Sequence, residues 1–212
     1  MNYKGNTAQF GKKSQPEFLP QFKVPKMEEY CMYFPFLELR KWGKKAAENR
    51  RRNCAVLPKV KPIGKFEAVD GSMRIRVYPE YRDAMTGLED FAYVQVLWWF
   101  SQCDNKGSRS KQTEQKPYKK GSAILGTFAT RAPERPNPIA VSTLFAASVD
   151  EENGIISLPY ADAFPGTPVL DIKPYIPSLD RAESVRMPQW CAHWSASIEQ
   201  SGDFDWASEF NF

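Results

Sequence analysis

Short stretches of alternating apolar and polar residues begin near Val60 and are typical of β-strands. In residues 73–78 (MRIRVY), one apolar position follows every polar one, and Asp70-Gly71 just before them is a tight-turn signal. The pattern predicts a hairpin over residues 65–78. We expect one face of this hairpin to be buried and the other to be basic and solvated.

Three further segments are also typical of strands. Residues 91–100 (FAYVQVLWWF) are apolar almost throughout, which predicts a strand covered on both sides and so indicates a second subunit packing there. Residues 139–149 and 155–158 flank Asn153-Gly154 and predict a second hairpin. Residues 169–173 predict one more short strand. The chain is therefore expected to be mainly β.

The remaining segments lack strand periodicity. Residues 1 to about 35 are polar and contain prolines, which indicates an extended arm, whereas apolar positions at three-to-four spacing predict one amphipathic helix over 36–52. Residues 104–120 (DNKGSRSKQTEQKPYKK) predict a flexible basic loop. After Pro177 an irregular tail is expected to pack through its tryptophans. We divide the chain into a basic arm and helix (1–59), a β-domain (60–181) and a tail (182–212).

Composition narrows the class of protein. The sequence has no apolar run long enough to span a membrane and no signal peptide, so we expect a cytoplasmic protein without membrane contact. Its four cysteines are scattered, and His193 is its one histidine. A metal site is therefore not expected, and the cysteines are interpreted as buried free thiols.

Charge is distributed unevenly along the chain. Residues 1–60 hold 13 Lys/Arg against 5 Asp/Glu, residues 61–181 hold 15 against 15, and residues 182–212 hold 1 against 5. A basic arm beside a neutral body fits a polyanion such as RNA. Alternatively, the acidic tail pairs with the basic arm of its own or a partner chain.

Two segments concentrate candidate chemistry. Residues 126–142 (GTFATRAPERPNPIAVS) combine arginines and prolines, which predicts a rigid loop between strands. Residues 166–177 (GTPVLDIKPYIP) place Asp171, Lys173 and Tyr175 at alternating positions, hence on one face of an extended strand. These side chains could form a pocket with the loop. The alternative is a salt bridge from Asp171 to Lys173 or Arg131 that serves structure only.

The two segments together resemble the paired signature of the TsaA-like (TrmO) family of tRNA adenine-N6 methyltransferases. GTFATRAPERPNP precedes GTPVLDIKPYIP by about thirty residues, as in that family. GLEDFAYVQVLWWF at residues 87–100 and PIGKF at 62–66 are similar to its preceding strands. The resemblance covers residues 62–180 and leaves the arm, the helix and the tail outside.

The resemblance implies a β-barrel that forms a homodimer and binds S-adenosylmethionine (SAM) near the subunit interface. It further implies methylation of N6 of a threonylcarbamoyl-modified adenosine beside the anticodon of a threonine tRNA. The positions that match the family's SAM contacts are Ser101, Gln102, Arg131, Val141, Pro159, Tyr160, Ala161 and Asp162.

The sequence departs from the family's pattern at several positions. Many relatives have His at Ser101, Gly at Ala140 and Asp-Gly at Pro165-Gly166, and a cofactor-contacting Pro-Arg-Gln loop is missing between residues 65 and 73. The arm or residues 109–120 would then close that part of the SAM pocket.

For the reaction, we hypothesise that Asn137 and Tyr175 orient the adenine, Asp171 acts as a base and Lys173 orders Asp171. Arg131 would hold cofactor or substrate. RNA phosphates would meet basic side chains at Arg50, Arg51, Arg52, Lys119 and Lys120. Two other functions remain open: a methyltransferase of this fold with another substrate, and a non-catalytic barrel that binds RNA.

Overall fold

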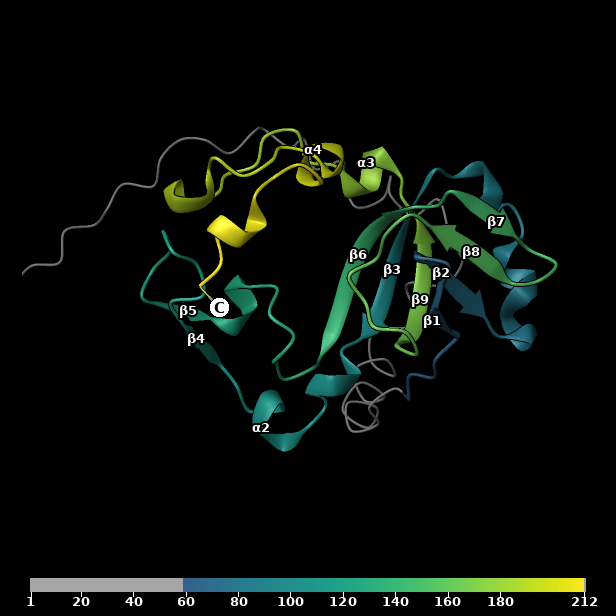
Figure 1. Cartoon of the computed structure of the whole chain (residues 1–212), viewed down its shortest axis with the longest axis horizontal. Coiled ribbons are helices and arrows are strands. Elements are labelled where there is room, and N and C mark those ends of the chain that lie inside the picture. The colour runs from purple at the N-terminus through teal and green to yellow at the C-terminus, as the bar shows by residue number, and fades with distance from the viewer. Residues whose placement is uncertain (1–58, 212) are drawn as a thin grey trace, which may run out of the picture. The chain divides into compact units, whose positions relative to one another are not determined.

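A computed structural model of the chain describes residues 59–211, which form a large antiparallel sheet with a smaller two-stranded sheet beside it (Figure 1). The predicted arm, the helix over 36–52 and the three arginines at 50–52 lie outside the described residues. The large sheet has the strand order β6-β3-β9-β1-β2-β8-β7. Its strands are β1 (Gly64–Val69), β2 (Ser72–Val77), β3 (Tyr93–Trp99), β6 (Ile139–Phe145), β7 (Ser148–Asp150), β8 (Ile155–Leu158) and β9 (Pro168–Pro174).

The first hairpin is confirmed. β1 and β2 pair antiparallel from Gly64↔Val77 to Val69↔Ser72. Asp70 and Gly71 form the turn with φ of 49° and 81°, the left-handed backbone that a tight hairpin turn requires. The outer face differs from the prediction in one respect. Arg74 and Arg76 are half-buried and paired with Glu67, so this basic face is neutralised in part by a carboxylate.

The second predicted hairpin is confirmed as β7 and β8, which pair across the turn at Asn153-Gly154. β6 instead pairs with β3 over its whole length, from Tyr93↔Phe145 to Trp99↔Ile139. β9, the predicted strand over 169–173, lies between β3 and β1. One face of β3 is fully buried and the other is half-buried, so among residues 59–211 the predicted covering is complete on one side only.

The core lies on the inner face of this sheet, because alternate residues of every long strand point into it. Phe66, Val94 and Val169 are fully buried, and the Trp98 ring packs edge-on against Phe66 at 5.9 Å between centroids. The remaining large members of the core are Ile75, Val77, Met85, Val96, Leu144, Ile156 and Leu158.

Between β3 and β6 the chain leaves the sheet over residues 100–138, which we call the excursion. It contains α2 (Lys106–Arg109), β4 (Thr113–Gln115) and β5 (Ile124–Gly126), and β4 pairs with β5. The prediction of a flexible loop over 104–120 is therefore wrong. Asn105 caps α2 by accepting a hydrogen bond from the Ser108 amide, and Lys111 pairs with Glu134, so local polar contacts give this segment its structure.

The C-terminal segment from Pro177 onward has little regular structure, as expected, and most of its residues are exposed. It contains α3 (Pro177–Asp180), α4 (Ile198–Ser201) and two short 3-10 helices, Gln189–Cys191 and Trp206–Ser208. The predicted packing of its tryptophans is confirmed: Trp194 contacts Trp190 at 5.4 Å and Trp206 at 5.3 Å between ring centroids. None of the helices in residues 59–211 combines the length and apolar character needed to cross a lipid bilayer.

Candidate cofactor cavity

Two adjoining cavities lie where β3 ends and β6 begins. The larger has a volume of about 570 Å³ and the smaller about 280 Å³, and they share Trp98, Phe100, Arg131 and Asp162 in their walls. The larger is completed by Ser101–Cys103, Pro133, Tyr160, Ala161, Ala163, Phe164 and Thr167, and the smaller by Arg135 and Ile139–Ser142. A concave site of this size, with apolar walls and few polar groups, suits a small organic ligand.

Aromatic rings form the apolar wall. Trp98 and Phe100 contact each other at 4.6 Å between ring centroids, and the Trp98 indole donates a hydrogen bond of 3.0 Å to the Ser142 hydroxyl. This bond fixes the indole against β6. Tyr160 and Phe164 are exposed at the cavity and present further flat apolar surface. Such surfaces can hold a planar base.

Arg131 carries the positive charge of the site. Its guanidinium donates one hydrogen bond to the Val141 backbone carbonyl, which orients it across the start of β6. Because a guanidinium has five donors, the others stay available for a carboxylate or another anionic group. The preceding Thr130 is buried, and its hydroxyl donates to the Thr127 carbonyl at 2.9 Å, so the backbone before Arg131 is held in place.

Asp162 brings a negative charge to the wall of the larger cavity. Asp162 is exposed toward solvent beside Tyr160. Burial, assisted by the nearby negative charge of Asp162, raises the pKa of the Tyr160 phenol, so it stays a hydrogen-bond donor at neutral pH. An arginine, a carboxylate and a phenol around an aromatic pocket can bind an amino-acid group, hydroxyl groups and a base at the same time.

The excursion contributes to the cavity at both of its ends. Ser101, Gln102 and Cys103 leave β3, and Arg131 and Pro133 lie on the returning segment. The Phe100 amide donates to the Pro138 carbonyl at 2.8 Å, which closes the base of the excursion directly under the cavity. Residues 109–120, predicted as one possible replacement for the missing Pro-Arg-Gln loop, line neither cavity; β1 and β2 instead meet in the tight turn at Asp70-Gly71.

Seven of the eight positions predicted for the cofactor gather around these cavities. Six of them, Ser101, Gln102, Arg131, Tyr160, Ala161 and Asp162, line the larger cavity, and Val141 lines the smaller. Pro159 lines neither. Sequence reasoning did not single out Trp98, Phe100 or Phe164. The sequence did contain a signal for Trp98 and Phe100, because both lie at the end of the apolar stretch over residues 91–100.

The four residues predicted for the reaction lie elsewhere. Asp171 and Lys173 lie on β9, Tyr175 follows it and Asn137 precedes β6, and none of them lines either cavity. The Lys173 ammonium pairs with the Asp171 carboxylate at 2.7 Å, so the structure contains the first of the two salt bridges that the sequence left open. Tyr175 packs against Tyr93 at 6.4 Å between ring centroids.

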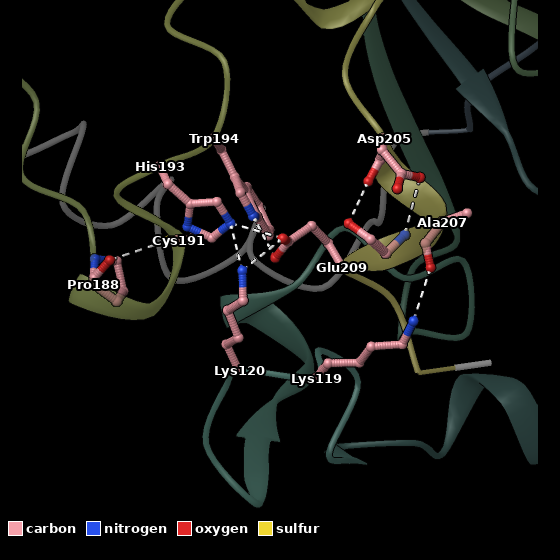
Figure 2. Close-up of polar contacts among 10 residues, drawn as sticks. Lys119, Lys120, Pro188, Cys191, His193, Trp194, Asp205, Ala207 and Glu209 are labelled. Carbon is pink, nitrogen blue, oxygen red and sulfur yellow. Dashed lines mark hydrogen bonds and ion pairs between the residues drawn. The ribbon is translucent and has the colours of Figure 1, made fainter.

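The two lysines predicted for RNA contact the C-terminal tail (Figure 2). The Lys119 ammonium donates to the Ala207 carbonyl at 3.0 Å, and the Lys120 ammonium pairs with Glu209 at 3.2 Å. Lys120 keeps 60% of its side chain exposed, so an external anion can still approach it. Glu209 of the acidic tail thus pairs with Lys120 of its own chain. The basic arm, the partner that the sequence suggested for the tail, lies outside the described residues, so that pairing stays a prediction.

Two curated proteins are similar in sequence to part of the chain. A tRNA (adenine(37)-N6)-methyltransferase of Escherichia coli is 32% identical over 147 residues, which are 65% of this chain and 62% of that protein. A probable S-adenosyl-L-methionine-binding protein of Pyrococcus abyssi is 35% identical over 130 residues, 61% of this chain and 66% of that protein. The matched region thus spans less than two thirds of either relative.

Solved structures and a family pattern also match. A crystal structure of TrmO is 28% identical with a TM-score of 0.49, covering 62% of this chain and 64% of that one. A TrmO structure from Pseudomonas aeruginosa has 28% identity and a TM-score of 0.48, covering 62% and 61%. Residues 59–181, more than half of the chain, match the family described as tRNA-methyltransferase O N-terminal domain. The chain belongs to this TrmO family.

Proposed function

We propose that this chain is a SAM-dependent tRNA methyltransferase that acts as a homodimer on N6 of the threonylcarbamoyl-modified adenosine beside the anticodon of a threonine tRNA. One observation carries the proposal most directly. Six of the eight residues that the family resemblance assigns to SAM converge, from three separate segments of the chain, on one cavity of about 570 Å³.

The side chains present suit each part of SAM. Arg131 would pair with the carboxylate of the methionyl group, Asp162 would accept hydrogen bonds from hydroxyl or ammonium groups, and the rings of Trp98 and Phe100 would cover the adenine. When bound, SAM supplies a methyl group activated by the sulfonium charge. The donor thus needs positioning rather than activation.

The contribution of the chain to the rate would come mainly from alignment. Holding two reactants in line can supply roughly 7–11 kcal/mol in favourable cases. We assign Asn137 and Tyr175 to orienting the adenine, Asp171 to accepting a proton and Lys173 to ordering Asp171. None of these four residues lines the cofactor cavity. If Asp171→Asn and Tyr175→Phe both keep normal kcat with saturating SAM, the assignment is wrong.

Binding of the tRNA would draw on basic side chains outside the cavity. We assign phosphate contacts to Arg50–Arg52, which lie beyond the described residues, and to Lys119 and Lys120. Anticodon-loop bases are unpaired and can stack on exposed aromatic rings such as Phe164. Each neutralised phosphate releases counterions, so the affinity for tRNA should depend steeply on salt. A protein that makes several phosphate contacts loses orders of magnitude in affinity between about 50 and 200 mM salt.

The first experiment is calorimetric titration of the full chain with SAM, comparing the natural sequence with Arg131→Ala and Arg186→Ala. Loss of a charge-assisted hydrogen bond costs about 1.5–3 kcal/mol, so we expect Arg131→Ala to weaken binding by about tenfold to a hundredfold. Arg186 is exposed and has no described partner, so its replacement should leave binding unchanged. Equal affinities in all three proteins would remove Arg131 from the site, and no binding at all would favour a non-catalytic RNA-binding protein.

A second candidate is a SAM-dependent methyltransferase with another substrate. The separation of Asp171 from the cofactor cavity favours it, because a smaller substrate would not need to reach β9. Methyl transfer from radiolabelled SAM to threonine tRNA, with and without the threonylcarbamoyl group, distinguishes the two. SAM binding without transfer to either tRNA would favour the second candidate.

A further inference from the structure

We infer that residues 189–211 form a strap that positions Arg131 at the cofactor cavity, and that Glu209 fastens this strap. The cavity's role as a SAM site rests on the proposed function, whereas the strap itself is argued from contacts within the chain. The strap lies outside residues 59–181, the part that matches the family.

The excursion needs outside support. β4 and β5 pair with each other and with no strand of the large sheet in the described part of the chain. Each of them has only three residues. An isolated two-stranded ribbon is at best marginally stable in water, and this one has few apolar residues to bury. Something else must therefore fix the excursion that carries Arg131.

The strap supplies backbone pairing. Phe210 forms a β-bridge with Tyr118. The Lys119 amide donates to the Glu209 carbonyl at 2.9 Å, and the Asn211 amide donates to the Pro117 carbonyl at 3.1 Å. The turn between β4 and β5 is thereby held along its edge by the end of the strap.

Aromatic packing adds the apolar contact that the ribbon lacks. Tyr118 is 8% exposed, and its ring stacks on Trp190 at 4.8 Å between centroids. Trp194 contacts the same ring edge-on at 5.3 Å, and Phe210 lies at 5.5 Å. Three aromatic residues of the strap thus enclose one tyrosine of the excursion. Such rings contribute more than their buried area alone.

Glu209 joins the strap to the excursion through its side chain (Figure 2). The residue is 3% exposed, and within the strap the Trp194 indole donates to its carboxylate at 3.1 Å while the His193 Nε2 lies 2.7 Å away. From the excursion, Lys120 pairs with it at 3.2 Å. The hydrogen bonds from His193 and Trp194, with that from Lys120, outweigh burial and lower the pKa of Glu209 to about 2. The carboxylate is therefore charged and fully engaged at neutral pH.

The strap is tied to the large sheet as well. The Tyr93 hydroxyl on β3 donates to the Glu199 carboxylate of α4 at 3.1 Å. Figure 1 shows the yellow C-terminal segment running from beside α3 to the β4–β5 ribbon. The strap therefore connects the sheet that forms one wall of the cavity to the excursion that forms another.

Within the excursion, a hydrogen bond and an ion pair connect the β4 end of the ribbon to the segments on either side of Arg131. The Thr127 amide donates to the Gln112 carbonyl at 2.9 Å, so the segment after β5 is joined to the start of β4. Lys111 pairs with Glu134, three residues beyond Arg131. The arginine thus stands between two points that are both bonded to the ribbon, and a shift of the ribbon would move its guanidinium.

The test compares Glu209→Ala with Glu183→Ala in the full chain. Glu183 is an exposed tail carboxylate without a described partner, so it is the matched control. Hydrogen exchange is measured first, because amides exchange faster where local structure opens. We expect at least tenfold faster exchange over residues 112–131 in Glu209→Ala only, with β1 to β3 unchanged as evidence that the sheet is still folded. Unchanged exchange over 112–131 would overturn the strap.

A double-mutant cycle then tests the link to the cavity, using SAM affinity of Glu209→Ala, Arg131→Ala and the double variant. If the strap acts through Arg131, Glu209→Ala should weaken SAM binding of the natural protein by about tenfold. In the Arg131→Ala protein, the same substitution should cause no additional loss of affinity. Additive losses, or unchanged affinity in Glu209→Ala, would overturn the link. If the natural protein binds no SAM, the proposed function fails, while the exchange data still decide whether the strap exists.

Discussion

Glu67 shows how one carboxylate organises the outer face of the first hairpin. Arg74 and Arg76 donate to it at 2.8 and 3.0 Å, and Lys65 lies 3.2 Å away. Burial alone would raise the pKa of Glu67, but the hydrogen bonds from the two arginines and the lysine lower it to about 2. A lowered pKa in the folded state means that the charged form stabilises the fold.

We therefore expect Glu67→Gln to reduce the free energy of unfolding at pH 7 by about 1–2 kcal/mol, after allowing for the partial exposure of its partners. Because the folded pKa lies below the unfolded value of 4.5, this stabilisation is complete above pH 4.5 and is lost as pH falls toward 2. Urea unfolding at pH 7 and at pH 2.5 measures it. A difference between variant and natural protein that is as large at pH 2.5 as at pH 7 would contradict the prediction.

The site could be predicted from the sequence only in part, and Asp171 illustrates the limit. Strand alternation correctly placed Asp171 and Lys173 on one face of β9. It could not tell whether that face meets the cavity, because this depends on which strand lies beside β9 and on its register. Seven of the eight positions predicted for SAM gather at the cavities, because a long family motif carries that tertiary information with it.

Among the elements, the β1–β2 hairpin depends on a close backbone approach. Gly64 faces Val77, and a Cβ added to this glycine would lie 2.4 Å from the Arg76 carbonyl oxygen. That oxygen belongs to the neighbouring strand and cannot rotate away. Any side chain at this position must push β1 and β2 apart.

Gly64→Ala should therefore lower the free energy of unfolding by about 1–3 kcal/mol, the usual range for forced overpacking. Gly126→Ala is the control, because nothing lies within 4 Å of a Cβ there and its φ is −65°. Urea unfolding of both variants measures the difference. Equal midpoints for the two variants would show that the strand pair adjusts without cost.

The elements also show what local sequence can predict. β1, β2 and β8 were foreseen, and their buried residues repeat with period two. β4 was missed because its sequence, TEQ, contains no apolar residue. Its order comes from partners distant in the chain, chiefly Phe210 and Glu209 around the adjacent turn, and no window of local sequence contains them.

For the whole molecule, the strand pairings of the described residues run from β6 to β7, so β6 is an edge strand of the sheet. Ile139, Val141 and Phe145 are 36%, 42% and 46% exposed along it. An exposed apolar edge strand invites pairing with another chain. The exposed edge strand is thus consistent with the predicted dimer. The dimer and the closure of the barrel both stay predictions.

We expect light scattering to give the mass of a dimer for the natural protein and of a monomer for Phe145→Asp, because a buried charge opposes association. Leu179→Asp is the control: Leu179 is 79% exposed and belongs to α3 rather than to the edge strand. A monomeric natural protein, or a Phe145→Asp variant that remains dimeric, would contradict this use of the edge.

The two ends of the excursion lie side by side, so the excursion is a separable insertion in the large sheet. Trp99 and Ile139 are paired neighbours, and the Phe100 amide already bonds to the Pro138 carbonyl. A tight turn could therefore replace the excursion and leave every ladder of the large sheet intact. The excursion is thus an insertion between two adjacent strands, so its length and composition can diverge, or be exchanged by grafting, without any change to the strand pairing of the large sheet.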